Sequence, residues 1–166
     1  GTVNQSFASG NVVTDNGKAG GLVGRNTDDA YIVKSFATGN VSGNSRVGGL
    51  TGANGGYISD SYARGSVTGD NNVGGLSGRC GGGIEKSYAT GQVIGDSNVG
   101  GIIGSDQGCD IIDTFWDTET TGIETTEGDG TGKVTVEMKD QTTFTSTESV
   151  GLSNPWDFEL TWNITS

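Results

Sequence analysis

The sequence predicts an all-β protein that folds as a parallel β-solenoid of about four to five coils, closed by an irregular, Trp-rich C-terminal cap. The main observation is a repeat: a Ser-aromatic-Ala triplet occurs four times, and each copy is followed by Gly-Gly-Leu or Gly-Gly-Ile. The last three copies begin at Ser35, Ser61 and Ser87, which are 26 residues apart. A constant period of this length is typical of supersecondary units that stack on one another.

Glycine content is high, but its placement favours order over disorder. The chain has 32 glycines in 166 residues, and Val, Ile, Leu and Phe together make up only about a fifth of it, which is near the composition of disordered chains. The glycines recur at fixed places in each repeat, as tight turns require. The periodicity therefore indicates a folded array.

Three columns of apolar residues recur from copy to copy and predict the core. Aligned on the triplet, the repeat reads I-x-x-S-[FY]-A-x-G-x-V, then a turn, then V-G-G-[LI]-x-G. Short apolar segments between Gly-rich turns favour strands, and frequent glycines disfavour helix. The columns are Val3, Ile32, Ile58, Ile84 and Ile111; Val12, Val41, Val67 and Val93; and Leu22, Leu50, Leu76 and Ile102.

The column just before each Ser alternates in charge. It reads Gln5, Lys34, Asp60, Lys86, Asp113. If the coils stack in register, each Lys faces an Asp in the neighbouring coil, and such cross-strand pairs contribute about 0.2–1 kcal/mol. We expect an inter-coil charge ladder here.

The two cysteines follow equivalent glycines of consecutive repeats. Cys80 comes after Gly78, and Cys109 comes after Gly104 at a different depth in its loop. Neighbouring coils lie about 4.8 Å apart, within the Cα separation that a disulfide accepts. A disulfide is one interpretation and needs an oxidising compartment; two free thiols are the other. A zinc site is disfavoured because the chain has no His and no further Cys.

The net charge of −11 disfavours nucleic acid as a partner. It is concentrated at the C-terminal end, where residues 113–166 hold 11 acidic and 2 basic residues. No run of 18 apolar residues occurs, so no membrane insertion by this segment is expected. The chain opens inside a repeat and shows no leader, so we expect it to be a piece of a longer protein.

The recurring V-G-G-[LI]-x-G followed by I-x-x-S-[FY]-A-x-G-x-V resembles the GLUG repeat over residues 3 to about 112. GLUG repeats are found in large bacterial and archaeal surface proteins, including stretches of some immunoglobulin A1 proteases outside their catalytic domains. The resemblance implies a right-handed parallel β-solenoid with an extracellular, non-catalytic role in adhesion or display. It divides the chain into repeats over 1–113 and a closing segment over 114–166, which such arrays often carry.

The closing segment contains all three Trp residues and a possible short helix over 134–140. Trp116 aligns with Ala89 of the last full repeat. A solenoid needs bulky residues to cover its final coil and to protect unpaired strand edges. We therefore interpret residues 114–166 as a cap packed on that coil.

Candidate ligand sites are few. Glu124, Glu127 and Asp129 crowd a Gly-rich turn and are weak calcium candidates, although they lack EF-hand spacing; no other cofactor is expected. Sequons at Asn4, Asn40 and Asn163 are candidate glycosylation sites. Without His, Ser-His-Asp and Cys-His catalysis is excluded.

The sequence thus favours a non-catalytic module of the extracellular cell surface, acting as a structural spacer or an adhesion surface. Its expected partners are other surface proteins, glycans or copies of itself. The alternatives are a subunit of a self-associating filament and a polysaccharide-binding module that uses exposed aromatic residues and turn carboxylates. Less favoured are a polysaccharide lyase or glycosidase, by analogy of fold, and an ice-binding protein, because an Arg and a Gln interrupt the outward Thr ranks.

Overall fold

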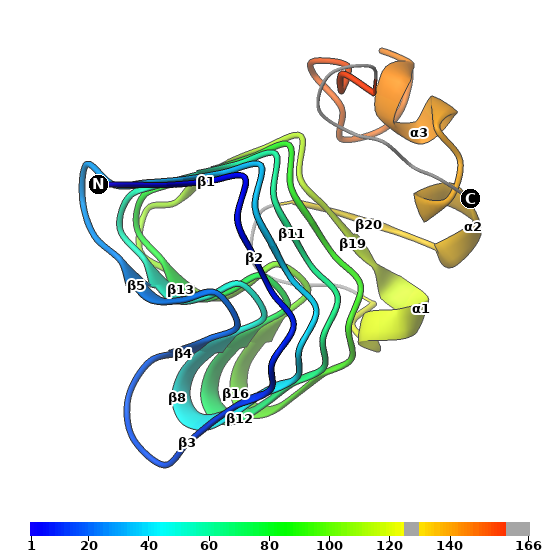
Figure 1. Ribbon diagram of the computed structural model, residues 1–166. Helices are drawn as coiled ribbons and strands as arrows, with labels where there is room; N and C mark the ends of the chain where they lie inside the picture. Colours follow the sequence, from blue (N-terminus) through cyan, green and yellow to red (C-terminus); the bar gives the residue numbers. More distant parts are fainter. Residues whose placement is uncertain (125–129, 159–166) are drawn as a thin grey trace.

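The computed structural model describes residues 1–124 and 130–158. The chain winds through about four coils, which together build four parallel sheets (Figure 1). An inner coil gives one strand to each sheet, whereas the first coil gives two short strands, β3 (Val12–Thr14) and β4 (Ala19–Gly20), to the third sheet. Viewed from the N-terminal end, the chain runs clockwise as it recedes, so the solenoid is right-handed (Figure 1). The predicted fold class is confirmed.

The four sheets follow one another around the coil. Sheet A contains β1 (Thr2–Asn4), β6 (Tyr31–Val33), β10 (Tyr57–Ser59), β14 (Gly83–Glu85) and β18 (Asp110–Ile112). Sheet B contains β2 (Phe7–Ala8), β7 (Phe36–Ala37), β11 (Tyr62–Ala63), β15 (Tyr88–Ala89), β19 (Phe115–Asp117) and β20 (Thr131–Lys133). Sheet C contains β3 (Val12–Thr14), β4 (Ala19–Gly20), β8 (Val41–Gly48), β12 (Val67–Gly74) and β16 (Val93–Gly100). Sheet D contains β5 (Val23–Asn26), β9 (Thr51–Asn54), β13 (Ser77–Cys80) and β17 (Ile103–Asp106).

The three predicted core columns are stacked in register. Ile58 pairs with Ile32 and Ile84 across sheet A, and Val67 pairs with Val41 and Val93 across sheet C. The Leu column is joined coil to coil by backbone hydrogen bonds, such as Leu50 N to Leu76 O at 2.9 Å. In the inner coils these side chains are almost fully buried, so the repeat period sets the stacking register.

Each eight-residue strand of sheet C turns back near its middle and forms a lobe of its own. Val67 and Val73, at the two ends of β12, belong to one small core that also contains their counterparts in neighbouring coils. Each of these strands has one residue with positive φ, which is Arg46 (55°), Asn72 (53°) or Asn98 (51°), directly before the Val that returns to the lobe core. The coils therefore enclose two cores, one in the main coil and one in this lobe.

Each coil has a narrow point, the waist, where the Ala of the triplet lies against the Gly-Gly corner. The lack of space at the waist explains why the repeat keeps these small residues. A Cβ added at Gly75 would lie 2.9 Å from the Cβ of Ala89, so sheet B and the Gly-Gly corner approach closely. In the last coil Trp116 takes the alanine position, because it pairs with Ala89. A Cβ at Gly101 would lie 2.3 Å from Trp116 Cγ, so the indole fills the waist where the coils end.

The segment after β19 closes the array in two ways. Strand β20 pairs with β19 and becomes the sixth strand of sheet B. Three short helices follow the last coil, namely α1 (Thr118–Thr121), α2 (Thr135–Met138) and α3 (Thr142–Thr145). Helix α2 matches the predicted short helix in place. Among the described residues, no helix is long and apolar enough to cross a membrane.

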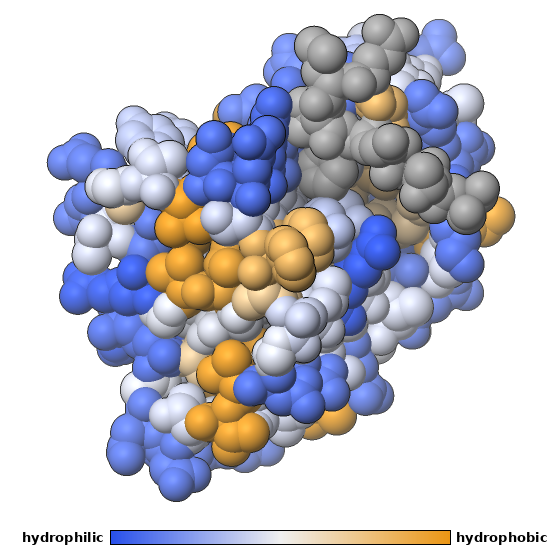
Figure 2. All heavy atoms as spheres, in the orientation of Figure 1, coloured by the Kyte–Doolittle hydropathy of each residue, from blue (hydrophilic) through white to orange (hydrophobic). Residues whose placement is uncertain are grey.

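At the opposite end the first coil exposes apolar side chains. Phe7 is 67% exposed, because no further coil stacks on it in this chain. Val13 is 77% exposed and belongs to an outward-facing column, in which the inner-coil residue Thr68 is exposed as well. Figure 2 shows hydrophobic residues grouped on the face that the first coil presents, framed by hydrophilic ones. The two ends of the solenoid therefore differ in character.

Candidate functional site

The alternating charge column forms a corner between sheets A and B, and its five residues all adopt left-handed backbone conformation. Their φ values are 48° for Gln5, 49° for Lys34, 49° for Asp60, 44° for Lys86 and 49° for Asp113. Backbone hydrogen bonds join the corners of neighbouring coils, for example Lys34 N to Ser59 O at 3.1 Å. The predicted register is therefore present.

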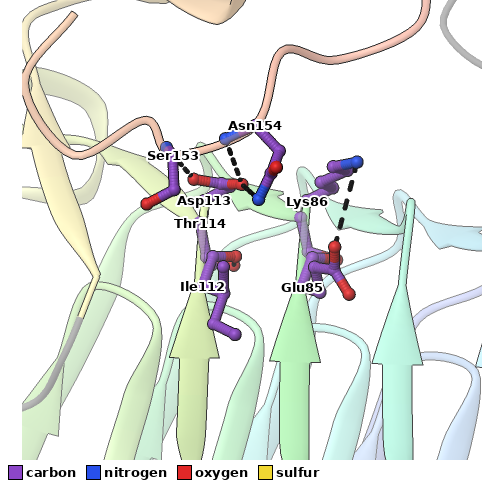
Figure 3. Close-up of polar contacts among 8 residues, drawn as sticks. Glu85, Lys86, Ile112, Asp113, Thr114, Ser153 and Asn154 are labelled. Atoms are coloured by element: carbon purple, nitrogen blue, oxygen red, sulfur yellow. Dashed lines mark hydrogen bonds and ion pairs between the residues drawn. The ribbon is translucent and has the colours of Figure 1, made fainter. Parts of the chain in front are cut away.

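The direct ion pairs that we expected between neighbouring coils do not form. Within residues 1–124 and 130–158, no Lys of this column lies within 4.0 Å of an Asp of the column, and Lys86 Nζ instead lies 3.8 Å from Glu85 Oε1 (Figure 3). Holding two solvated side chains together at a surface costs rotamer freedom for little Coulomb gain. Asp60 is still attracted by Lys86 and Lys34 of the neighbouring coils, so the column acts as a series of nearby opposite charges without direct ion pairs among the described residues.

Asp113 has a different role and holds the cap. It is 4% exposed, and its carboxylate accepts hydrogen bonds from the backbone N–H groups of Ser153 and Asn154, the latter at 2.9 Å (Figure 3). The Asn154 amide Nδ2 donates a third hydrogen bond at 3.4 Å. Hydrogen bonds to a charged acceptor are stronger than neutral ones, so Asp113 fixes the cap segment on the last corner.

Asp60 is the column carboxylate whose pKa is raised, because burial disfavours its charged form more than the attraction of Lys86 and Lys34 favours it. With a folded-state pKa above the unfolded value of 3.8, its contribution to stability is full at low pH and is lost as the pH rises through the folded-state pKa.

We expect Asp60→Asn to raise the free energy of unfolding at pH 7 by roughly 0.5 kcal/mol or less, since the site is partly solvated. Asn also tolerates the left-handed backbone. Thermal unfolding at pH 3 and pH 7 checks this: the two proteins should differ at pH 7 and converge at pH 3. If Asp60→Asn raised the free energy of unfolding equally at both pH values, the raised pKa of Asp60 would not be the cause.

Cys80 and Cys109 form a disulfide in the structure, with a Cα–Cα distance of 5.4 Å. Coil four has one more residue than coil three in this loop, because Cys80 aligns with Asp106 whereas Gly83 aligns with Asp110. That extra residue lets Cys109 turn inward, where it is 5% exposed. The bond joins two consecutive coils at the rim of sheet D.

The calcium and glycosylation candidates are only partly placed. Glu124 is exposed, whereas Glu127, Asp129 and Asn163 lie outside the described residues. Asn4 is exposed at the end of β1. Asn40 Oδ1 accepts a hydrogen bond of 3.0 Å from Ser66 N, so its side chain links two coils. Among the residues the structure describes, no group of three or more acidic or Cys side chains could hold a metal ion.

The aromatic residues of the repeat stack on the outer face of sheet B. Ring centroids are 5.3 Å apart for Phe7–Phe36, 4.7 Å for Phe36–Tyr62 and 4.9 Å for Tyr62–Tyr88. Arg64 lies over the Tyr62 ring at 4.9 Å and donates to the Tyr88 hydroxyl at 2.7 Å. Burial raises the pKa of Tyr88 above its ordinary value.

The cap packs on the C-terminal part of this aromatic column. Phe115, Phe144, Leu152 and Trp156 form a third core, and Tyr62 and Tyr88 pack against it. The cap thus lies beside the outer face of sheet B (Figure 1), while Trp116 fills the interior of the last coil. The aromatic face is open only at the first coils.

A groove of about 350 Å³ lies between sheet D and the lobe of sheet C, and the sequence analysis missed it. One wall is an outward column of sheet D, which reads Arg25, Ala53, Arg79 from the first coil to the third. The other wall carries Lys18 and Arg46, which directly precede the paired residues Ala19 and Val47. The remaining lining residues are Asp28, Asn54, Gly55, Gly81 and Gln107.

The base of the groove is too tight for side chains. A Cβ added at Gly78 would lie 2.4 Å from Arg46 C and 2.4 Å from Val47 N, so the two walls meet backbone to backbone. The second wall could have been found by aligning the turn column, where Lys18 and Arg46 stand in line with Asn72. The two columns face each other because of the way the lobe folds. The sequence did not reveal that fold.

Comparison with known proteins shows the fold. No family model matches the chain, and no curated protein matches it. Among solved structures, the crystal structure of a putative immunoglobulin A1 protease from Bacteroides ovatus is similar, with a TM-score of 0.58 and 23% sequence identity. The match covers 83% of this chain and 51% of that one, so the chain spans about half the length of its structural relative. The likeness shows that this chain is a β-solenoid of a kind already seen in a crystal structure.

Proposed function

We propose that the chain is a rigid, non-catalytic module of an exported cell-surface protein of the GLUG-repeat type, serving as a structural spacer that presents its long faces. The observation that carries this proposal is the continuous stacking of strands in all four sheets, joined between consecutive coils by the Cys80–Cys109 disulfide. A stack held by parallel ladders keeps a fixed length.

Two further observations support the proposal. Disulfides persist in oxidising compartments such as the cell exterior, and this one joins two buried residues, Cys80 at 0% and Cys109 at 5% exposure. The described carboxylates are dispersed over strands, corners, turns and caps, and the acidic residues buried most deeply, Asp113 and Asp117, are occupied in holding the cap and the start of α1. Such carboxylates serve structure.

Labelling of intact cells that produce the parent protein tests the proposal. An antibody against the folded solenoid should stain cells equally before and after permeabilisation, and thiol alkylation of the extracted protein should leave Cys80 and Cys109 unmodified until a reductant is added. Staining that requires permeabilisation, or cysteines that alkylate without reductant, would overturn the assignment to the cell surface.

A further inference from the structure

We propose that the groove between sheet D and the lobe of sheet C binds a linear anionic polysaccharide, held by Lys18, Arg25, Arg46 and Arg79. The chain carries 9 basic and 20 acidic residues, yet four of the basic ones line this groove together with a single acid, Asp28. A basic groove in an acidic protein focuses anions on that site.

The four cations are not neutralised by the protein. In the described part of the chain, none of them has a carboxylate oxygen within 4.0 Å, and the ion pairs found there lie elsewhere, at Lys86 and Lys133. Arg79 Nη2 donates to the neutral side chain of Gln107, to Oε1 at 3.2 Å. That bond orients the guanidinium without cancelling its charge, and leaves other N–H donors for an anion.

Arg46 occupies a position that costs backbone strain. Its φ is 55°, and the equivalent residues of the next two coils are asparagines, with φ of 53° and 51°. Asn adopts the left-handed region readily, whereas a long side chain without a local hydrogen bond is disfavoured there. A strained residue that departs from its repeat is a reasonable starting point for a functional hypothesis. Here the departure places a guanidinium opposite Arg25 and Arg79.

The arrangement of the cations suits a chain of anionic groups. Arg25 and Arg79 are two coils apart on one wall, which corresponds to about 10 Å at about 4.8 Å per coil, and the small side chain of Ala53 lies between them. Lys18 and Arg46 face them from adjacent coils. Arg binds carboxylate and sulfate in a planar, bidentate manner, so an extended polymer with repeated acidic groups can meet several cations together.

Other polyanions fit less well. The described lining residues include no aromatic side chain for base stacking, and the acidic remainder of the protein repels a long nucleic acid. Strands β9 and β13 along the groove are paired on both sides, and the outer edge of β5 lies at the end of the stack, so an acidic peptide that runs across the coils has no strand edge to extend. Sugar hydroxyl groups, in contrast, suit the polar side chains of the rim, such as Gln107.

The disulfide fixes one rim of the groove. Cys80 directly follows Arg79, and Cys109 closes the loop that carries Gln107. The two partners of the Arg79–Gln107 hydrogen bond therefore stand on segments that are covalently joined. A wall held in place before binding loses less freedom when the ligand arrives.

Titration calorimetry with defined polymers tests this proposal on the intact chain. The probes are polygalacturonate, dextran sulfate, neutral dextran and inorganic sulfate, each at low and at physiological salt. We expect binding of polygalacturonate or dextran sulfate that weakens steeply with salt, and no binding of neutral dextran. Equal binding of dextran, affinity for inorganic sulfate as high as for the polymers, or no binding of either anionic polymer at low salt would each overturn it.

The double variant R46N/R79S provides the decisive comparison. Both replacements copy residues that the repeat already uses at these positions, Asn72 and Ser105, so folding is preserved. We expect affinity to fall at least about tenfold, which corresponds to the loss of about 1.4 kcal/mol. The control is K34Q, which copies Gln5, removes a single positive charge and should stay within about twofold of the original. An equal loss in K34Q would show that net charge, and not the groove, carries binding.

This binding site does not depend on the spacer role. A protein that fails to bind either polymer while it is displayed on intact cells would refute the groove alone. One that binds them but is found inside the cell would refute the surface assignment alone.

Discussion

Replacing Gly65 by alanine is expected to lower the free energy of unfolding by at least about 3 kcal/mol, because the added methyl group has no space. A Cβ at Gly65 would lie 1.9 Å from the carbonyl oxygen of Gly39 in the preceding coil, and one at Gly91 would lie 1.9 Å from Gly65 O. Backbone atoms on both sides are tied into coil-to-coil hydrogen bonds, so the clash can be relieved only by separating the coils. Chemical denaturation followed by circular dichroism measures the loss.

Gly10 supplies the matched control for this prediction. It occupies the same column in the first coil, but a Cβ there meets no atom within 4 Å. Gly10→Ala should therefore change the stability by less than about 1 kcal/mol, the range of ordinary Gly-to-Ala effects. If both variants lost stability equally, intrinsic backbone preference would be the cause, and coil-to-coil contact would not.

Loss of the Cys80–Cys109 disulfide is expected to destabilise the solenoid by about 3 to 4 kcal/mol on the loop-entropy account. The two cysteines are 29 residues apart in sequence, so the bond closes a loop about as long as one coil in the unfolded chain. Denaturant unfolding of the protein with and without reductant measures the effect, and the C80A/C109A variant checks it in the absence of thiols. In the variant the reductant should have no effect. If it lowered the variant's stability too, the reductant would be acting elsewhere.

The stacking was readable from the sequence because the repeat reports it directly. A side chain that recurs every 26 residues must meet its own copies when coils stack, so the Ile, Val and Leu columns were predicted together with their pairing. The waist between Ala and Gly-Gly follows the same logic. The signal for the waist in the sequence is that the smallest residues, Ala and Gly-Gly, stand at two fixed positions of each repeat.

Features that depend on the direction of side chains could not be predicted from the repeat. The column of Lys34, Asp60 and Lys86 has the predicted register, but partly solvated side chains at a corner gain little from direct pairing. The groove needs the lobe, and the lobe forms where the eight-residue strands β8, β12 and β16 turn back, each with a single left-handed residue. A linear pattern of residues gives no distance between two such columns.

The sequence predicted a cap of bulky residues, but it did not predict how those residues are arranged. Phe144 and Trp156 come from a segment without repeats, and only the fold shows that they pack on Phe115 and on the aromatic column of sheet B. Asp113 looked like one more member of a charge series. Its role in binding the backbone of Ser153 and Asn154 depends on where that segment returns.

The tryptophan in the waist has a consequence for how such a protein lengthens or shortens over evolution. Each coil between Ser35 and Ala89 offers glycine and alanine to the next, so duplication or loss of 26 residues there preserves the backbone ladders and the packing of the waist. After Trp116 the same unit no longer fits, because the indole takes the alanine position and fills the waist against Gly101. The length of the rod is therefore set by the position at which the gene replaces alanine with tryptophan, and new coils enter only upstream of it.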